Sequence, residues 1–156
     1  MLVLGVDPGS RVTGYGLVQK NGNTMTCIHA GSVSFSGNRS FHERIHSIFQ
    51  SLVEVIEHYQ PEEMAIEDIF MAKNARSALK LGHARGAALI AATQCGIKIY
   101  EYTPLEIKKS VVGYGRATKE QVRSMSQVIL NLQKRYGLDT SDALAAAICH
   151  LNWTRR

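Results

Sequence analysis

Residues 1–10 read MLVLGVDPGS, an apolar run that ends on a carboxylate and is followed at once by Pro8-Gly9-Ser10. A short apolar run bounded by turn residues predicts a buried strand, so the Asp7 side chain is expected at the carboxyl edge of that strand. Met64-Ala65-Ile66 repeats the arrangement in front of Glu67. Because burying a carboxylate at a strand end is costly unless it is paired or coordinated, these two acids are the first candidates for a functional site.

The segments around this first strand predict an α/β fold. Strands are expected at 2–7, 13–20 and 24–29, with Asn21-Gly22 as a hairpin turn and the third strand extending toward residue 35. Further strands are expected at 64–67 and 97–102. Helices are expected between the Ser40 cap and Pro61, at 74–95, from Thr103-Pro104, from Thr118 to Leu132 and at 140–153, with a flexible connector at 111–117. This order predicts a mixed five-stranded sheet, an antiparallel meander plus parallel strands, flanked by helices.

The chain of 156 residues has the length of one domain, so a single domain is expected over 1–156. No stretch approaches the roughly 20 apolar residues of a membrane span, and the N-terminus lacks a secretory signal, so a cytoplasmic protein is expected. The three scattered cysteines argue against a disulfide framework or a thiolate zinc site. The net charge of +5 favours a polyanionic partner, although charge alone does not prove nucleic-acid binding.

Two further acids, Asp139 and Asp142, stand near the start of the last predicted helix. On their own they are explained as a helix cap and a favourable charge at the helix N-terminus. Together with Asp7 and Glu67 they form a set of four carboxylates, the hard ligands that two Mg²⁺ ions about 4 Å apart require for phosphodiester hydrolysis. Without cations, their repulsion would raise some of the carboxyl pKa values. The set therefore predicts a metal site.

Two glycines lie inside the predicted helix 74–95, where each costs about 1 kcal/mol relative to alanine. We expect another helix, from the same chain or from a second copy, to approach closely along Ala78, Gly82 and Gly86. A positive stripe is predicted on the opposite face, formed by Lys73, Arg76, Lys80 and His83. A solvated surface explains this stripe equally well.

The connector at 111–117 is surrounded by positive charge, contributed by Lys108, Lys109, Arg116 and Lys119. Mobile backbone combined with positive charge suits contacts to phosphate groups. Tyr114 stands between two glycines and is a candidate DNA contact. Phe70 follows a predicted strand, where a core residue is the simpler interpretation.

Four longer segments carry a resemblance to a known family. These segments, GVDPGSRVTGYGLV (5–18), AIEDIFMAKNARSALKLGHARGAA (65–88), TPLEIKKSVVGYGRATK (103–119) and DTSDALAAAICH (139–150), resemble the RuvC family of Holliday-junction resolvases. The resemblance implies an RNase H-like fold, a homodimer and paired symmetric nicking of four-way DNA junctions, in recombination and repair in the bacterial cytoplasm. Two Mg²⁺ ions per active site are implied, with Mn²⁺ as an expected substitute. Cooperation with the RuvA and RuvB branch-migration proteins is implied as well.

Carried over by position, the family's catalytic and metal-binding acids fall on Asp7, Glu67, Asp139 and Asp142. Its loop aromatic falls on Phe70, which favours stacking on an unpaired base there. Its two functional lysines fall on Lys108 and Lys119. The implied homodimer makes a second copy the expected partner of the face formed by Ala78, Gly82 and Gly86.

Three other interpretations compete with this resemblance. His42-Glu43-Arg44-Ile45-His46 matches the HExxH pattern of zinc proteases, but Glu43 already serves the predicted capping box and no third ligand is evident. GVDPGS resembles the phosphate loop of actin-like and sugar-kinase ATPases, but that class needs two facing domains. A junction-binding protein without catalysis would not require the full set of four acids.

Overall fold

The computed structural model of the chain describes residues 1–35, 38–68 and 74–154. Its strands are β1 (Leu2–Asp7), β2 (Val12–Asn21), β3 (Thr24–Ser34), β4 (Glu63–Glu67) and β5 (Lys98–Tyr102). Its helices are α1 (Phe41–Tyr59), α2 (Ala75–Gln94), α3 (Pro104–Val112), α4 (Lys119–Ile129) and α5 (Leu138–Trp153). No helix in the described ranges has the length and apolar character needed to cross a membrane.

The strands form one sheet in the order β3-β2-β1-β4-β5. β1, β2 and β3 are antiparallel neighbours, whereas β4 runs parallel to β1 and β5 runs parallel to β4. The predicted mixed five-stranded sheet is therefore confirmed, and β3 extends to Ser34 as expected. Val6 of β1 pairs with Ile66 of β4, so the two acids that follow them end adjacent parallel strands at the same edge.

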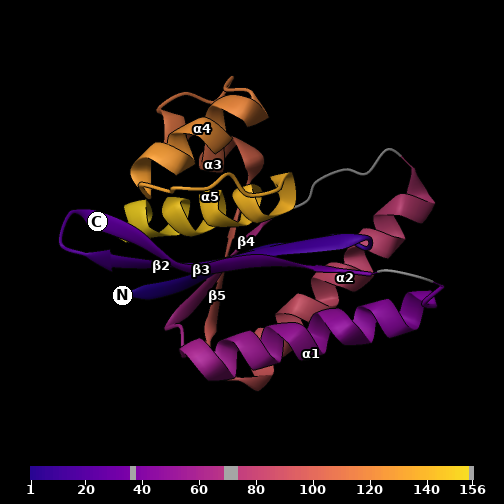
Figure 1. Cartoon of the computed structure of the whole chain (residues 1–156). Helices are drawn as coiled ribbons and strands as arrows, with labels where there is room; N and C mark the ends of the chain where they lie inside the picture. The colour runs from indigo at the N-terminus through magenta and orange to yellow at the C-terminus, as the bar shows by residue number, and fades with distance from the viewer. Residues whose placement is uncertain (36–37, 69–73, 155–156) are drawn as a thin grey trace.

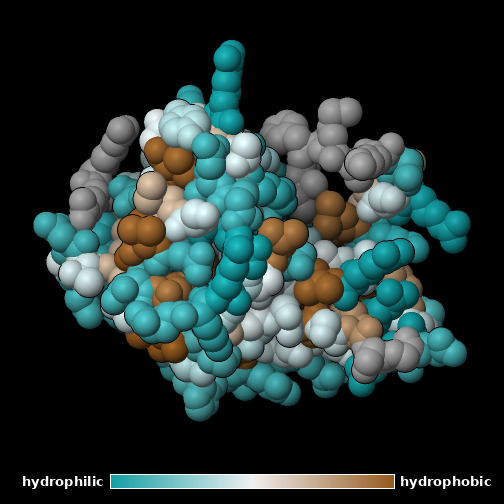
Figure 2. Space-filling model, turned by 45° about the horizontal axis from the view of Figure 1, so that its top comes forward, coloured by the Kyte–Doolittle hydropathy of each residue, from teal (hydrophilic) through white to brown (hydrophobic). Residues whose placement is uncertain are grey.

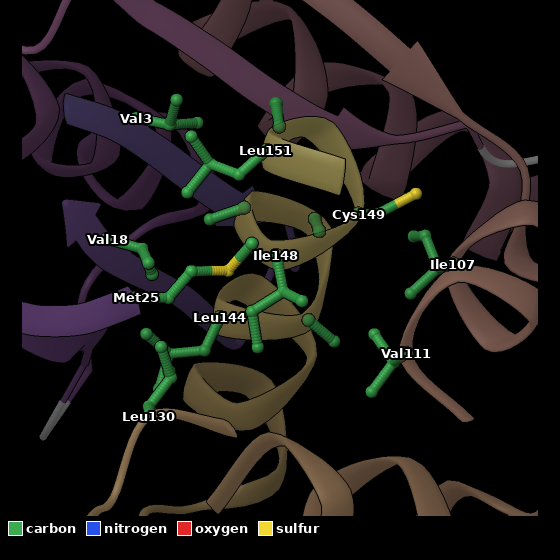
Figure 3. Close-up of a cluster of buried hydrophobic side chains, with 14 of the residues drawn as sticks. Val3, Val18, Met25, Ile107, Val111, Leu130, Leu144, Ile148, Cys149 and Leu151 are labelled. Carbon is green, nitrogen blue, oxygen red and sulfur yellow. The ribbon is translucent and has the colours of Figure 1, made fainter. Parts of the chain in front are cut away.

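Helices cover both faces of the sheet, with α1 and α2 on one side and α3, α4 and α5 on the other (Figure 1). Side chains alternate between the two faces along each strand. Leu4 and Val6 accordingly pack in the cluster that includes α1 and α2, while Val3 packs in the cluster around α5. In Figure 3, Leu151 of α5 points toward Val3 of β1, and Cys149 points toward Ile107 of α3.

The main chain of α5 lies directly on β1 and β2 because these strands carry glycine where the helix crosses them. A Cβ atom on Gly5 would overlap the main chain of Ala143, and a Cβ on Gly14 would overlap the main chain of Asp139. The side chains from Ala143 to Leu151 are all buried. α5 is therefore the central helix of its layer, and its position along the sheet is set by contact with backbone.

The predicted capping boxes at Ser40, Thr103 and Thr118 are all present. Two helix boundaries differ from the prediction. α3 continues through Val112 and ends at Gly113, whose φ of 93° suits glycine, so the connector begins two residues later than expected. α4 ends at Ile129, which leaves Leu132 outside the helix.

The start of α5 also differs from the prediction. The helix begins at Leu138, and its N-cap residue is Gly137, without a side-chain capping bond. The predicted helix start at Thr140 and the predicted capping role of Asp139 are therefore wrong. Asp139 lies inside the first turn, where its carboxylate is not used by the cap.

Candidate active site

Strand geometry directs two of the four acids to one face of the sheet. Asp7 shares its face of β1 with Val3, and Glu67 shares its face of β4 with Ala65, because alternate residues point the same way. Val3 and Ala65 both belong to the cluster around α5. The Asp7 and Glu67 side chains therefore emerge on the α5 side of the sheet, at the carboxyl ends of two neighbouring strands.

The first turns of α5 supply the other two acids. Asp7 pairs with Gly14 across the β1–β2 ladder, and Gly14 lies against the main chain of Asp139. Asp142 is three residues further on and shares the same side of the helix. The hydroxyl of Thr140 donates to the carbonyl of Gly31 at 2.9 Å, which ties this end of α5 to β3.

These four carboxylates influence one another. Burial raises the pKa of Asp7 to about 8, and the neighbouring carboxylates of Asp142, Glu67 and Asp139 add to this increase. Burial, followed by the Asp142 charge, also raises the pKa of Glu67. The predicted effect of crowding acids without cations is thus present. A cation placed among them would favour ionised Asp7.

A lysine stands beside this acidic group. Lys119, the first residue of α4, donates from Nζ to Oδ2 of Asp142 at 2.8 Å, and this hydrogen bond raises the pKa of the lysine. Lys108, Lys119, Glu67 and Asp142 line a cavity of about 200 Å³ whose remaining walls are apolar residues of α3, α4 and α5. Both lysines to which the resemblance points therefore lie next to the predicted acids.

The donor set fits hard divalent cations. Among the described residues, no three carboxylate, imidazole or thiol groups converge tightly enough to ligate one ion together. Magnesium does not require three, because it keeps several waters and takes one or two carboxylates. Oxygen donors with mutual repulsion, one of them with a pKa near 8, match the charge requirement of such ions.

One contributor was missed at the sequence level. Thr13 of β2 is fully buried, and its hydroxyl donates to the carbonyl of Gly9 at 2.9 Å while accepting from the Gly9 N–H at 3.2 Å. Thr13 thus braces the turn that follows Asp7. A buried threonine four residues after a turn glycine is the only signal of this role, and spacing does not distinguish it from an ordinary strand threonine.

The candidate DNA contacts differ in their surroundings. Lys109, Tyr114 and Arg116 are exposed, and Lys108 is half-buried. Arg76 and Lys80 are exposed on α2, where the Lys80 ammonium lies 6.0 Å from the centre of the Phe41 ring. The predicted sites Phe70 and Lys73 lie outside the described residues. On the face of the molecule shown in Figure 2, hydrophobic residues are scattered among hydrophilic ones. The surface of this face is therefore mainly polar.

The prediction of a positive stripe on α2 is wrong for one residue, His83. His83 does not lie opposite the small residues but lines a groove between α1 and α2 together with Gly82 and Gly86. Adjacent residues on a helix are only about 100° apart, so one groove can include both. The groove has a volume of about 1110 Å³, and Ala78 lines it as well.

Two exposed apolar side chains mark this groove, Leu79 at 66% and Ile90 at 61% exposure. Both histidines of the HExxH pattern also line it, so His83 is a third imidazole at the same place, which the sequence did not reveal. Glu43 is engaged as predicted, since its carboxylate accepts the Ser40 N–H at 2.7 Å.

A family profile and individual relatives of known sequence point to the same family. The profile of the family described as "Crossover junction endodeoxyribonuclease RuvC" matches residues 3–150. A relative of that name from Geobacter sulfurreducens is 50% identical over 152 residues, covering 97% of this chain and 93% of the relative. Another from Citrifermentans bemidjiense is 51% identical over 150 residues, covering 96% and 92%.

Solved structures agree with these relatives. The structure described as "T. thermophilus RuvC in complex with Holliday junction substrate" superposes with a TM-score of 0.93 at 34% identity, covering 99% of this chain and 95% of that chain. The yeast mitochondrial Holliday junction resolvase Ydc2, at 12% identity and a TM-score of 0.66, shares the fold. The chain therefore belongs to the RuvC family of crossover junction endodeoxyribonucleases, which confirms the predicted family, fold class and enzyme class.

Proposed function

We propose that this protein resolves four-way DNA junctions by hydrolysing phosphodiester bonds at Asp7, Glu67, Asp139 and Asp142. One observation supports this site above all: four acids from three distant segments act on one another at a single sheet edge, and the pKa of Asp7 rises to about 8. Such crowding of buried carboxylates is unfavourable unless the acids serve cations. A structural relative at 34% identity carries a Holliday junction substrate.

The metal assignment follows from the coupling among the acids. Asp7 is influenced by all three of the others, so Asp7, Glu67, Asp139 and Asp142 are the residues that would hold two Mg²⁺ ions, with Mn²⁺ as a substitute. Such ions supply an activated water and neutralise charge on the phosphate oxygens. Bound ions would favour the ionised form of Asp7, and Lys119 holds the carboxylate of Asp142 through its hydrogen bond.

The DNA contacts are proposed from exposure and charge. Half-buried Lys108 lines a cavity with Glu67 and Asp142, and exposed Lys109 and Arg116 lie near it in sequence, where they suit phosphate groups. Tyr114 is 47% exposed and free to stack on a base. Exposed Arg76 and Lys80 extend the proposed contact to α2, and Lys73 and Phe70 are proposed as contacts from the resemblance alone. A chromosomal substrate is the reason for proposing a cytoplasmic location.

We also propose a homodimer formed through the groove between α1 and α2. A Cβ on Gly82 or Gly86 meets nothing within 4 Å in the described chain, so these helical glycines are not required by its own packing. The exposed apolar side chains of Leu79 and Ile90 gain burial when a second copy covers them. The single nuclease domain over 1–156 is proposed from the chain length, and the cooperation with RuvA and RuvB is proposed from the resemblance.

Replacing Asp7 with asparagine tests the proposed site. The Asp7→Asn protein keeps the shape of the side chain but loses its charge, so we expect junction binding to be retained and Mg²⁺-dependent cleavage to fall below detection. Binding is measured by gel shift in Ca²⁺, and cleavage on a synthetic four-way junction beside a linear duplex. Glu54→Gln, which removes an exposed acid of α1, is the matched control and should cleave normally. Mg²⁺-dependent cleavage that persists in Asp7→Asn would refute the assignment of the active site to these four acids.

A further inference from the structure

Arg85 makes an unusual set of contacts from the middle of α2. Its side chain is only 15% exposed, and Nη1 donates to the main-chain carbonyl of Glu67 at 2.6 Å. Nη2 pairs with the carboxylate of Glu101 on β5 and lies 3.9 Å from Oδ1 of Asp68. One guanidinium therefore joins α2 to the ends of both β4 and β5.

These contacts hold the main chain at the residue where β4 ends. The Asp68 N–H donates to the carbonyl of Tyr102 on β5 at 2.7 Å, while the Glu67 carbonyl accepts from Arg85. The peptide unit that follows Glu67 is thus fixed from two sides. Because the direction of a side chain follows from its backbone, the Glu67 carboxylate inherits this constraint.

Arg85 acts on the backbone of Glu67 rather than on its charge. The cations that lower the pKa of Glu67 are Lys119 and Lys108, both from the opposite helical layer. The two lysines therefore favour the ionised form of the Glu67 carboxylate, whereas Arg85 restrains the position of the Glu67 main chain.

We propose that Arg85 is a positioning residue that holds Glu67 in the orientation needed to bind a divalent cation. This inference rests on the proposed role of Glu67 at the metal site. A guanidinium suits the task because its planar fork reaches a carbonyl and a carboxylate at once, which a lysine ammonium cannot do with the same geometry. Residues that orient metal ligands typically change affinity or activity by about 10–100-fold when they are replaced.

The test compares Arg85→Lys and Arg85→Gln with a matched arginine elsewhere. Arg123 of α4 has a side chain 16% exposed and likewise donates to a main-chain carbonyl, that of Tyr136. Arg123→Lys therefore reports the loss of stability from the same change away from Glu67. Mn²⁺ binding to the protein alone is measured from the electron paramagnetic resonance of free Mn²⁺, beside the thermal midpoint and the kcat and KM for a four-way junction.

We expect Arg85→Lys to weaken Mn²⁺ binding and lower kcat by about 10-fold, with KM for the junction little changed, and Arg85→Gln to do so more strongly. Arg123→Lys should lose similar stability but keep wild-type Mn²⁺ binding. If Arg85→Lys and Arg123→Lys behave alike in Mn²⁺ binding and kcat, Arg85 is merely structural. Should Arg85→Gln not fold, Arg85→Lys decides, because it keeps the charge and the aliphatic stem.

Glu67→Gln separates this inference from the function on which it rests. Wild-type cleavage and Mn²⁺ binding in Glu67→Gln would refute the proposed site itself. A defective Glu67→Gln beside a fully active Arg85→Lys would refute only the role of Arg85.

Discussion

Asp7 ends β1 with a carboxylate that is partly buried beside three others, and its protonation links the cation to the stability of the fold. Its pKa in the folded, metal-free protein is about 8, whereas an aspartate in an unfolded chain has a pKa near 3.9. Between these values the folded chain binds a proton that the unfolded chain does not. The contribution of Asp7 to stability is therefore fully present below about pH 4 and is lost as pH rises through about 8.

We expect the metal-free Asp7→Asn protein to be more stable than wild type at pH 8, because asparagine cannot ionise. The gain should raise the thermal midpoint by at least ~3 °C, since about 1 kcal/mol shifts a domain of this size by roughly 2–4 °C. Thermal unfolding in EDTA at pH 5 and pH 8 measures it, and the difference between the two proteins should be several-fold smaller at pH 5, where folded Asp7 keeps its proton.

Mg²⁺ supplies the control for this prediction. Added at pH 8, it should stabilise wild type more than Asp7→Asn, because only wild type regains a favourable partner for the Asp7 charge. A midpoint difference between the two proteins that is the same at both pH values would contradict the raised pKa.

At the scale of elements, the acidic site depends on how closely α5 approaches the sheet. Gly14 pairs with Asp7 on one side and lies against the main chain of Asp139 on the other. The glycine thus sets the distance between the strand acids and the helix acids. Lys119 is brought to Asp142 by α4, which packs on the same helix.

Gly14→Ala should displace α5, because the added Cβ would overlap the main chain of Asp139. We expect a loss of about 1–3 kcal/mol, as for other insertions into tightly packed sites, together with reduced cleavage. Urea unfolding and junction cleavage measure the two effects. Gly137→Ala is the control at the same end of α5, since its Cβ meets nothing within 4 Å. Equal losses in the two variants would show that close packing at Gly14 is unimportant.

The helix starts that carry side-chain capping signals were predicted correctly from the sequence. The N-cap residues Ser40, Thr103 and Thr118 mark the starts of α1, α3 and α4, and the predicted capping boxes are present. α5 has no such signal, because its N-cap is Gly137, and its start was misplaced by two residues. Val112 was taken for connector because the glycines after it suggest a loop.

The strand acids were predictable because each ends an apolar run, whereas the contacts of Arg85 were not. Its main acceptor is a backbone carbonyl, which leaves no pattern in the sequence. A single arginine among the small residues from Ala84 to Ala88 is the only trace of a partly buried charge. Likewise, residue spacing suggested a positive stripe that included His83, but only the packing of α1 against α2 shows that His83 faces the groove.

At the scale of the whole molecule, the acidic site and the proposed dimer face lie on different sides of the sheet. The acids emerge toward α5, whereas the groove lies between α1 and α2 on the opposite face (Figure 1). α2 belongs to both regions, because it lines the groove and reaches Glu67 through Arg85. A dimer built in this way would leave both acidic edges open, as paired nicks require.

Gly86→Glu should separate the proposed dimer into folded monomers. Its side chain starts where nothing in the described chain lies within 4 Å, so the monomer can accommodate it, but two buried charges would oppose association. Light scattering should show half the mass of wild type, and junction nicks should no longer occur in pairs. Val128→Glu, which adds the same charge at a 74% exposed position on α4, should remain dimeric. A dimeric Gly86→Glu protein would contradict the proposed interface.

The central place of α5 has a consequence for protein synthesis. This helix supplies two of the four acids and much of one hydrophobic core, yet it comes after every strand and the four other helices in chain order. A ribosome that has made residues 1–137 has produced β1 to β5 without the helix that packs directly on one face of the sheet, and only two of the four acids of the proposed site. On the proposed assignment of the four acids, the nascent chain cannot cleave DNA until the same segment completes both a hydrophobic core and the active site.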